Sequence, residues 1–208
     1  TSKSSSGSSS PSTNVSSDKN LLSPKSFEDE TYALTDIKGH FCEEHVKSLL
    51  EKSVISGYPD KTFRPDNKIS RAEFSKLVCA FLNIKENNES NIIYSDINSS
   101  EWFAPYIYAL SNQNIVTGYN GKFMPNENIS RQDAAVILFR SIKDKLNASA
   151  NTVDFSDNED IDIYAKEAVS TLAANKIIQG SENTFLPRHD LTRAEAAVII
   201  NKAIEFTK

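Results

Sequence analysis

The chain has 208 residues, of which 38% are hydrophobic and 25% charged, so it is long enough to fold into one or two ordinary domains. Its formal net charge of −5 argues against a broad nucleic-acid surface, because such a surface needs excess positive charge to neutralise phosphates. No run approaches the roughly 18 apolar residues of a membrane span, and the chain opens without the apolar stretch of a signal peptide. We therefore expect an internal or C-terminal piece of a longer protein.

The first 33 residues are rich in serine and poor in apolar side chains. Such a segment cannot bury enough surface to offset the conformational entropy that ordering would cost. We expect residues 1–33 to be a flexible linker to an upstream part of the protein.

From residue 34 onward the chain repeats one pattern, with copies at 34–93, 94–152 and 153–208. The corresponding residues are Asp36, Phe41, Leu49, Gly57, Phe63, Pro65 and Arg71 in the first copy, Asp96, Trp102, Leu110, Gly118, Phe123, Pro125 and Arg131 in the second, and Asp157, Tyr164, Leu172, Gly180, Phe185, Pro187 and Arg193 in the third. The glycines are 61 and 62 residues apart and the arginines 60 and 62, so chance agreement is implausible.

Each copy is predicted to begin with a helix, because its apolar residues recur with a helical period. The predicted helices span 41–54, 102–116 and 164–178. Each ends at or just before a glycine, namely Gly57, Gly118 or Gly180. Glycine there would supply the left-handed residue that closes a helix C-terminus, and a close approach of ligand to its bare backbone is an optional further role. In the loops that follow, the phenylalanine is expected to fill the core and the proline to prevent a premature helix.

A capping box, with a hydroxyl and a carboxylate three residues apart, opens the second helix of each copy. The pairs are Ser70 with Glu73, Ser130 with Asp133, and Thr192 with Glu195. Because Asp133 is shorter than glutamate, the second box is predicted to be weaker. The following helices are apolar over more than a narrow stripe, so we place them at the centre of the molecule. The predicted fold is all-α, a pseudo-threefold and three-pronged assembly of three helix-loop-helix repeats around a central three-helix bundle.

The box arginines Arg71, Arg131 and Arg193 are the strongest candidates for function. Each occupies the first helical position, where the helix dipole disfavours a cation. The same unfavourable choice in three copies marks a candidate site. A guanidinium beside the free N–H groups of a helix N-terminus would suit an anion, such as an acidic substituent on a sugar. The alternative is that each arginine bridges to an acidic residue of a neighbouring copy.

Two further series are weaker candidates. The repeated aromatic residues Phe41, Trp102 and Tyr164 would stack on sugar rings if exposed, or else belong to the core. The loop lysines Lys61 and Lys122 would add positive charge to a site, although simple solvation is the favoured interpretation.

No catalytic residue, metal ligand or cofactor is predicted. The histidines share no repeat position, and the sequence contains no nucleophile elbow, phosphate-binding loop or paired cysteine motif. The aspartates around residues 154–162 lack the glycine and terminal glutamate of an EF-hand loop. Cys42 and Cys79 are interpreted as buried free thiols, with a disulfide between them as the alternative.

Taken together, these motifs resemble the S-layer homology domain family. The resemblance covers about residue 34 to the end and is carried by V-I-S-G-Y-P-D-K-T-F-R-P, I-V-T-G-Y-N-G-K-F-M-P and I-I-Q-G-S-E-N-T-F-L-P, followed by the boxes SRAE, SRQD and TRAE. Phe41 and Tyr164 depart from the tryptophan common in the family, and the third copy lacks the loop lysine. We therefore expect the three grooves between repeats to bind unequally, with any groove that relies on the third loop the weakest.

The resemblance implies non-covalent anchoring of an exported protein to the bacterial cell surface. In this family, grooves between prongs bind secondary cell-wall polysaccharide attached to peptidoglycan, often through a pyruvate ketal that the box arginine contacts. The implied partners are this acidic polymer and the upstream domains of the same polypeptide, with no nucleic acid and no membrane insertion. A protein–protein docking module is the alternative. An enzyme that cleaves polysaccharides is a weaker one, because it would need two facing carboxylates.

Overall fold

The computed structural model describes residues 34–147 and 153–208, so the predicted linker over 1–33 lies outside the described residues. The described part contains six α-helices, two short 3-10 helices and isolated β-bridges, without a strand, which confirms the predicted all-α class. The elements are α1 (Glu43–Glu51), α2 (Arg71–Leu82), α3 (Ala104–Asn112), α4 (Arg131–Ile142), η1 (Lys143–Lys145), η2 (Asn158–Asp160), α5 (Lys166–Ala174) and α6 (Arg193–Thr207).

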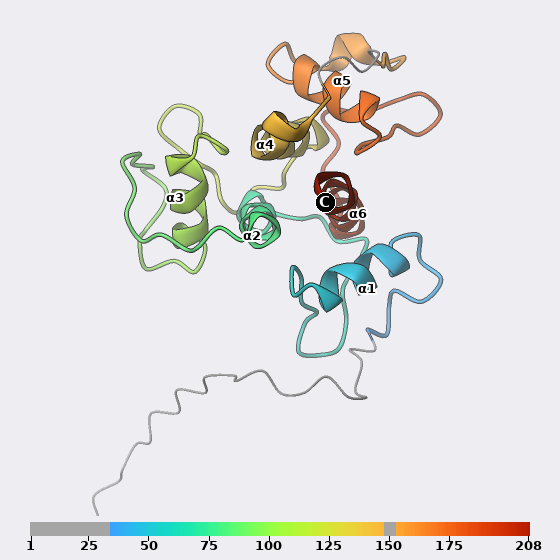
Figure 1. Ribbon diagram of the computed structural model, residues 1–208. Helices are drawn as coiled ribbons and strands as arrows, with labels where there is room; N and C mark the ends of the chain where they lie inside the picture. Colours follow the sequence, from blue (N-terminus) through green and yellow to red (C-terminus); the bar gives the residue numbers. More distant parts are fainter. Residues whose placement is uncertain (1–33, 148–152) are drawn as a thin grey trace, which may run out of the picture. The chain divides into compact units, whose positions relative to one another are not determined.

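The second helices of the three repeats form the central bundle that the sequence predicts. Each of α2, α4 and α6 contacts the other two. Figure 1 looks down these three helices, with α1, α3 and α5 arranged outside them. Buried alanines such as Ala134 and Ala196 face this centre together with larger apolar side chains, which allows the helices to approach closely.

Packing between the inner and outer helices crosses the repeat boundaries. The outer helix α3 packs on α2, and α5 packs on α4, so each outer helix lies against the central helix of the preceding repeat. The ring is closed by α1, from the first repeat, on α6, from the third. A polar network joins this last pair, in which the Ser48 hydroxyl donates to Asn201 Oδ1 at 2.9 Å and Asn201 Nδ2 lies 3.1 Å from His45 Nδ1. The two ends of the domain therefore depend on each other.

A closed ring of backbone hydrogen bonds joins the segments that precede the central helices. The N–H of Ile69 donates to the carbonyl of Leu191 at 3.0 Å, that of Leu191 to Ile129 at 2.9 Å, and that of Ile129 to Ile69 at 3.0 Å. All three side chains are buried. Because each bond joins two different repeats, the ring fixes how the N-termini of α2, α4 and α6 are placed relative to one another.

The repeated aspartate holds the loop of its own repeat. Both carboxylate oxygens of Asp96 accept backbone N–H groups, from Phe123 at 2.8 Å and from Met124 at 2.7 Å. Asp36 and Asp157 make the same pair of bonds in the other repeats. The loop phenylalanines Phe63, Phe123 and Phe185 are buried, as predicted.

The outer helices are shorter than predicted. They end at Glu51, Asn112 and Ala174 rather than near the pattern glycines. The left-handed residues that follow them are Ser53, Asn114 and Lys176, with φ values of 56°, 57° and 61°. The aromatic residues predicted to lie inside these helices precede their first turns instead.

The pattern glycines serve close packing, so their predicted role in closing a helix is wrong. Among the glycines of the described residues, Gly39 and Gly121 are the ones with a positive φ, so the pattern glycines do not adopt the left-handed conformation. A Cβ on Gly118 would lie 2.1 Å from the Lys122 carbonyl oxygen and 2.7 Å from the Tyr94 ring. A Cβ on Gly180 would lie 2.4 Å from the Thr184 carbonyl oxygen, and one on Gly57 would lie 2.4 Å from the Leu34 side chain and 3.0 Å from the Thr62 carbonyl oxygen. A side chain at these positions would therefore displace the loop or, at Gly57, first the Leu34 side chain.

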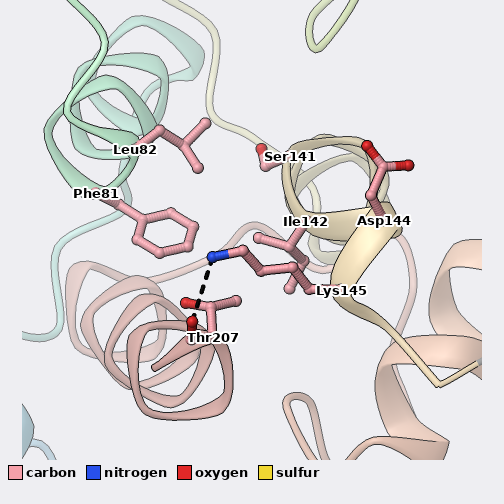
Figure 2. Close-up of a pocket in the computed structure, with 7 residues that line it drawn as sticks. All are labelled: Phe81, Leu82, Ser141, Ile142, Asp144, Lys145 and Thr207. Atoms are coloured by element: carbon pink, nitrogen blue, oxygen red, sulfur yellow. Dashed lines mark hydrogen bonds between the residues drawn. The ribbon is translucent and has the colours of Figure 1, made fainter.

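At the C-terminal ends of the central helices lies a pocket of about 250 Å³ (Figure 2). Its side chains include Phe81, Leu82 and Ile142, and Lys145 Nζ donates to the Thr207 carbonyl at 3.2 Å. A lysine at a helix C-terminus offsets the negative end of the helix dipole. Lys145 is thus explained as a cap on α6.

The two cysteines are buried free thiols, as predicted. Burial raises the pKa of Cys42 to about 11 and that of Cys79 to about 12. Both thiols therefore stay protonated at neutral pH.

Candidate functional site

Each box arginine reaches from the start of a central helix to the loop of the next repeat. Its Nε donates to the carbonyl of the loop phenylalanine at 2.9 Å in all three cases, from Arg71 to Phe123, from Arg131 to Phe185, and from Arg193 to Phe63. The guanidinium also lies over the same phenylalanine ring, 4.8 to 5.1 Å from its centroid. These contacts combine a hydrogen bond with a cation–π interaction.

The arginines also pair with box carboxylates of the neighbouring repeat. Arg131 lies 2.8 Å from Glu195, Arg193 lies 3.6 Å from Glu73, and Arg71 lies 3.7 Å from Asp133. Only 11 to 14% of each arginine side chain is exposed. The alternative interpretation, bridging between copies, therefore describes a real contact, and each arginine stabilises the interface between two repeats.

The predicted use of free helix N–H groups is wrong. The N–H of Arg193 donates to the Asn67 carbonyl at 2.8 Å, and that of Ala194 donates to the Pro65 carbonyl at 2.9 Å. The first two N–H groups of α2 and α4 donate to the loops of the next repeat in the same way. The third N–H group of each helix donates to its cap hydroxyl. Hence only the guanidinium remains to bind an anion.

One groove brings together candidates from all three repeats. It has a volume of about 820 Å³ and is lined by Gly57 from the first repeat, Trp102 from the second and Arg193 from the third. We call it the Trp102 groove. Trp102 is 53% exposed, so the aromatic residue of this repeat belongs to the surface and not to the core. An exposed indole beside a guanidinium suits an acidic sugar, because the ring can stack on the indole while the acid meets the cation.

Two further residues of the Trp102 groove were not singled out from the sequence. The Lys76 ammonium lies 5.7 Å from the centroid of the Trp102 ring and 5.6 Å from that of Tyr106. The centroid of the Tyr58 ring lies 4.9 Å from the guanidinium carbon of Arg193. Lys76 follows the box residue Glu73 by three positions, a spacing that places both on one helix face. That spacing does not show that Lys76 meets Trp102 and Tyr106 of the next repeat, so the sequence carried no signal for it.

Arg193 is the least engaged of the three arginines. Within the described residues its guanidinium donates a single hydrogen bond, to the carbonyl oxygen of Phe63. Arg131, in contrast, donates three hydrogen bonds, to Phe185, Glu195 and Gln179. Arg193 lines the Trp102 groove, and within the described residues its terminal N–H groups make no hydrogen bond, although one nitrogen lies 3.6 Å from Glu73.

Around Arg71 the protein supplies its own partners. The Tyr164 hydroxyl donates to Asp133 at 2.8 Å, and Gln132 Nε2 contacts both this hydroxyl at 3.1 Å and Asp162 at 2.6 Å. Burial and the bond to Asp133 raise the pKa of Tyr164 above its ordinary value. Asp133 forms only half of its capping box, as its shorter side chain predicts. Its carboxylate instead accepts from the Tyr164 hydroxyl and lies 3.7 Å from Arg71.

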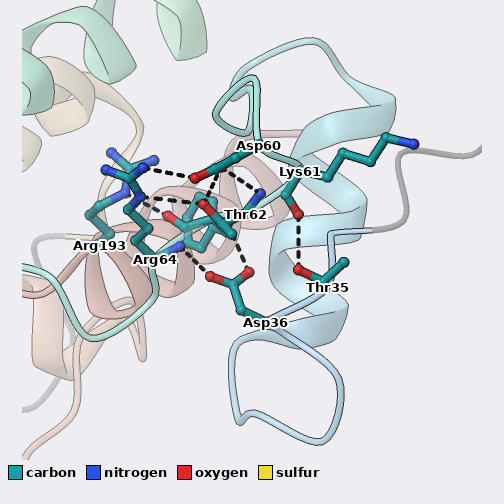
Figure 3. Close-up of polar contacts among 8 residues, drawn as sticks. Thr35, Asp36, Asp60, Lys61, Thr62, Arg64 and Arg193 are labelled. Atoms are coloured by element: carbon teal, nitrogen blue, oxygen red, sulfur yellow. Dashed lines mark hydrogen bonds and ion pairs between the residues drawn. The ribbon is translucent and has the colours of Figure 1, made fainter.

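The remaining candidates are dispersed. Phe41 is 65% exposed, and Tyr164 is 54% exposed, so the aromatic series lies at the surface throughout. Lys61 and Lys122 are also exposed. Figure 3 shows the Lys61 side chain extending away from Arg193, on the other side of the loop that Asp36 holds. The lysine that accompanies Arg193 is thus Lys76 and not the predicted loop lysine.

Over 34–147 and 153–208, no group of three histidine, cysteine or acidic residues is placed to hold a metal ion. None of the helices described in these ranges has the length and apolar character needed to cross a membrane.

Comparison with known proteins identifies the repeats. The family model of the S-layer homology domain matches residues 33–75, 93–135 and 154–197. The chain is 31% identical to an amylopullulanase of Thermoanaerobacterium thermosulfurigenes, over 85% of this chain and 10% of the relative. It is 31% identical to a cellulosome-anchoring protein of Acetivibrio thermocellus (73% and 35%) and 27% identical to the S-layer protein sap of Bacillus anthracis (78% and 20%). It therefore spans from a tenth to about a third of these relatives. Because the family model matches more than half of the chain, in three tandem copies, the chain belongs to the S-layer homology domain family.

Proposed function

We propose that this chain is a non-enzymatic module that attaches an exported protein to the bacterial cell wall by binding an acidic secondary cell-wall polysaccharide. Membership of the S-layer homology family supports a role in cell-surface anchoring. The relatives named as a cellulosome-anchoring protein and an S-layer protein support the same role. The relative named as an amylopullulanase is matched over only 10% of its length, which fits a module that forms a small part of a larger protein.

The Trp102 groove is the binding site in this proposal. The observation that carries it is the convergence of Arg193, Trp102 and Gly57, from three different repeats, on one groove of about 820 Å³. Sugar rings present apolar faces that stack on an indole, and a carboxylate of the polymer accepts hydrogen bonds from a guanidinium. A pyruvate ketal is the expected acidic substituent, because it places a carboxylate directly on the sugar ring.

Recognition must come from these local groups. The net charge of the chain is −5, so an acidic polymer gains nothing from attraction to the molecule as a whole. Arg193 is only 14% exposed, and a hydrogen bond from a guanidinium shielded in this way is stronger than one in open water. Loss of one such bond lowers affinity about ten- to a hundredfold.

A sedimentation assay with purified cell-wall sacculi tests the proposal. We expect the parent chain to sediment with native sacculi and to remain in solution after the polysaccharide is removed. The Arg193→Ala and Trp102→Ala variants should lose binding, while Ile93→Ala, which removes another exposed apolar side chain, should bind like the parent. Equal binding to native and stripped sacculi would refute the proposal and favour docking to a wall protein.

A further inference from the structure

We propose that the Trp102 groove contains a second anion-binding subsite at Lys76, so that its preferred ligand is a saccharide with two acidic groups. The inference rests on the proposed function of this groove. The first acidic group pairs with Arg193, and the second pairs with the Lys76 ammonium, with Trp102 beneath the sugar between them.

The Lys76 ammonium has a defined position, although it lies at the surface. It lies over two aromatic rings, 5.7 Å from the centroid of Trp102 and 5.6 Å from that of Tyr106. Both distances are within the range in which the ring quadrupole attracts a cation. The side chain is thereby held at the groove wall, which lowers the entropic cost of fixing it when a ligand binds.

The carboxylates that line the groove are engaged with other groups. Glu73 accepts from the N–H of Ser70 at 2.8 Å and lies 3.6 Å from Arg193. Burial and the neighbouring Glu86 carboxylate raise the pKa of Tyr106 to about 12, so Glu86 lies beside that hydroxyl. In the part of the chain that the structure describes, no acidic group forms an ion pair with Lys76. Its charge is therefore available to an external anion.

Arg193 and Lys76 both line the Trp102 groove, and Glu73 relates one to the other. Glu73 lies 3.6 Å from Arg193. Lys76 follows Glu73 by three residues on α2, which corresponds to about 4.5 Å along the helix axis. A ligand with two acidic groups that lies in this groove therefore has one cation for each of them.

The other two repeats lack this lysine. Lys76 comes five residues after the box arginine, and the equivalent positions hold Val136 and Val198. Valine cannot bind an anion, so preference for a second acid is expected at the Trp102 groove and not beside the other two box arginines. The subsite would thus set the ligand preference of this chain, independently of the arginine that all three repeats share.

Calorimetric titration with two matched disaccharides tests the subsite. Both contain one pyruvylated N-acetylhexosamine, linked in one probe to glucuronate and in the other to glucose, so that they differ in charge and hardly in size. We expect the parent to bind the glucuronate probe about tenfold more tightly. Lys76→Gln should abolish this preference without lowering the affinity for the glucose probe. Lys76→Arg should keep the preference. Lys143→Gln, which removes an exposed lysine at the end of α4, should behave like the parent.

The outcomes separate the two proposals. If the parent binds both probes equally, or if Lys76→Gln keeps the preference, the second subsite is refuted while the groove remains a binding site. If neither probe binds the parent, the proposed function fails, and the subsite fails with it.

Discussion

Arg131→Ala should cost more stability than Arg193→Ala, whereas Arg193→Ala should cost more binding affinity. The Arg131 guanidinium donates three hydrogen bonds across a repeat boundary, including one of 2.8 Å to Glu195. Arg193 donates one. At about 1 kcal/mol for each net hydrogen bond, Arg131→Ala should lower the free energy of unfolding by about 3 kcal/mol and Arg193→Ala by about 1 kcal/mol. The difference of about 2 kcal/mol corresponds to about 4–8 °C in Tm for a domain of this size.

Binding should show the reverse order. Because Arg193 lines the Trp102 groove and its terminal N–H groups make no hydrogen bond within the described residues, its loss should lower the affinity for a pyruvylated sugar about ten- to a hundredfold. Arg131→Ala, studied where it remains folded, should bind within about twofold of the parent, which is below the effect of losing one hydrogen bond. Urea unfolding and calorimetric titration of the same preparations provide both quantities. Equal losses of stability in the two variants would refute the reasoning from hydrogen-bond number, and a larger binding defect in Arg131→Ala would refute the choice of groove.

Four further predictions concern the packing of the fold. Gly118→Ala should destabilise the fold by about 2–4 kcal/mol through overpacking, because its Cβ would lie 2.1 Å from a carbonyl oxygen; Gly121→Ala, at φ 74° with open space, should cost only about 1–2 kcal/mol of backbone strain in the same urea assay. Asn201→Ala should loosen the contact of α1 with α6, since it removes the bonds to Ser48 and His45, and hydrogen exchange should show faster opening of α1 than of α3. Cys79 should react with a thiol reagent at pH 8 only as fast as the protein unfolds, because its folded pKa is about 12. Its contribution to stability is complete below its ordinary pKa of 9.0 and is lost as the pH rises toward about 12, so the unfolding free energy of the parent should fall more than that of Cys79→Ala between pH 8 and 10.5. Equal losses of stability in the two glycine variants would contradict the crowding at Gly118. Equal hydrogen-exchange rates in α1 and α3 of Asn201→Ala would contradict the role of Asn201. Rapid labelling of Cys79 in the folded chain would contradict its burial.

Local chemistry made part of this structure predictable from the sequence. The capping boxes fixed the starts of α2, α4 and α6, and the shorter Asp133 correctly predicted an incomplete box. Broad apolar surfaces identified the central helices, and the spacing of Phe63, Phe123 and Phe185 identified buried loop residues. These features depend on residues within a few positions of one another, where sequence spacing and spatial distance agree.

Contacts between repeats could not be predicted in this way. The three copies share one pattern, and that pattern does not say which copy a residue meets in space. The sequence spacing therefore does not reveal that α1 packs on α6, or that Arg193 reaches the loop of the first repeat. The same limit explains the wrong prediction about helix N–H groups, whose acceptors lie in a different repeat. Lys76 was missed because its importance comes from Trp102 and Tyr106, which belong to the next repeat. The Trp102 groove is therefore a product of the assembled ring.

Determination of a crystal structure with a pyruvylated wall sugar bound tests the central claim most directly. Our account predicts density for the sugar in the Trp102 groove, with its ring on the Trp102 indole and its carboxylate within hydrogen-bond distance of the Arg193 guanidinium. A sugar bound elsewhere while this groove is empty, or a carboxylate turned away from Arg193, would contradict it.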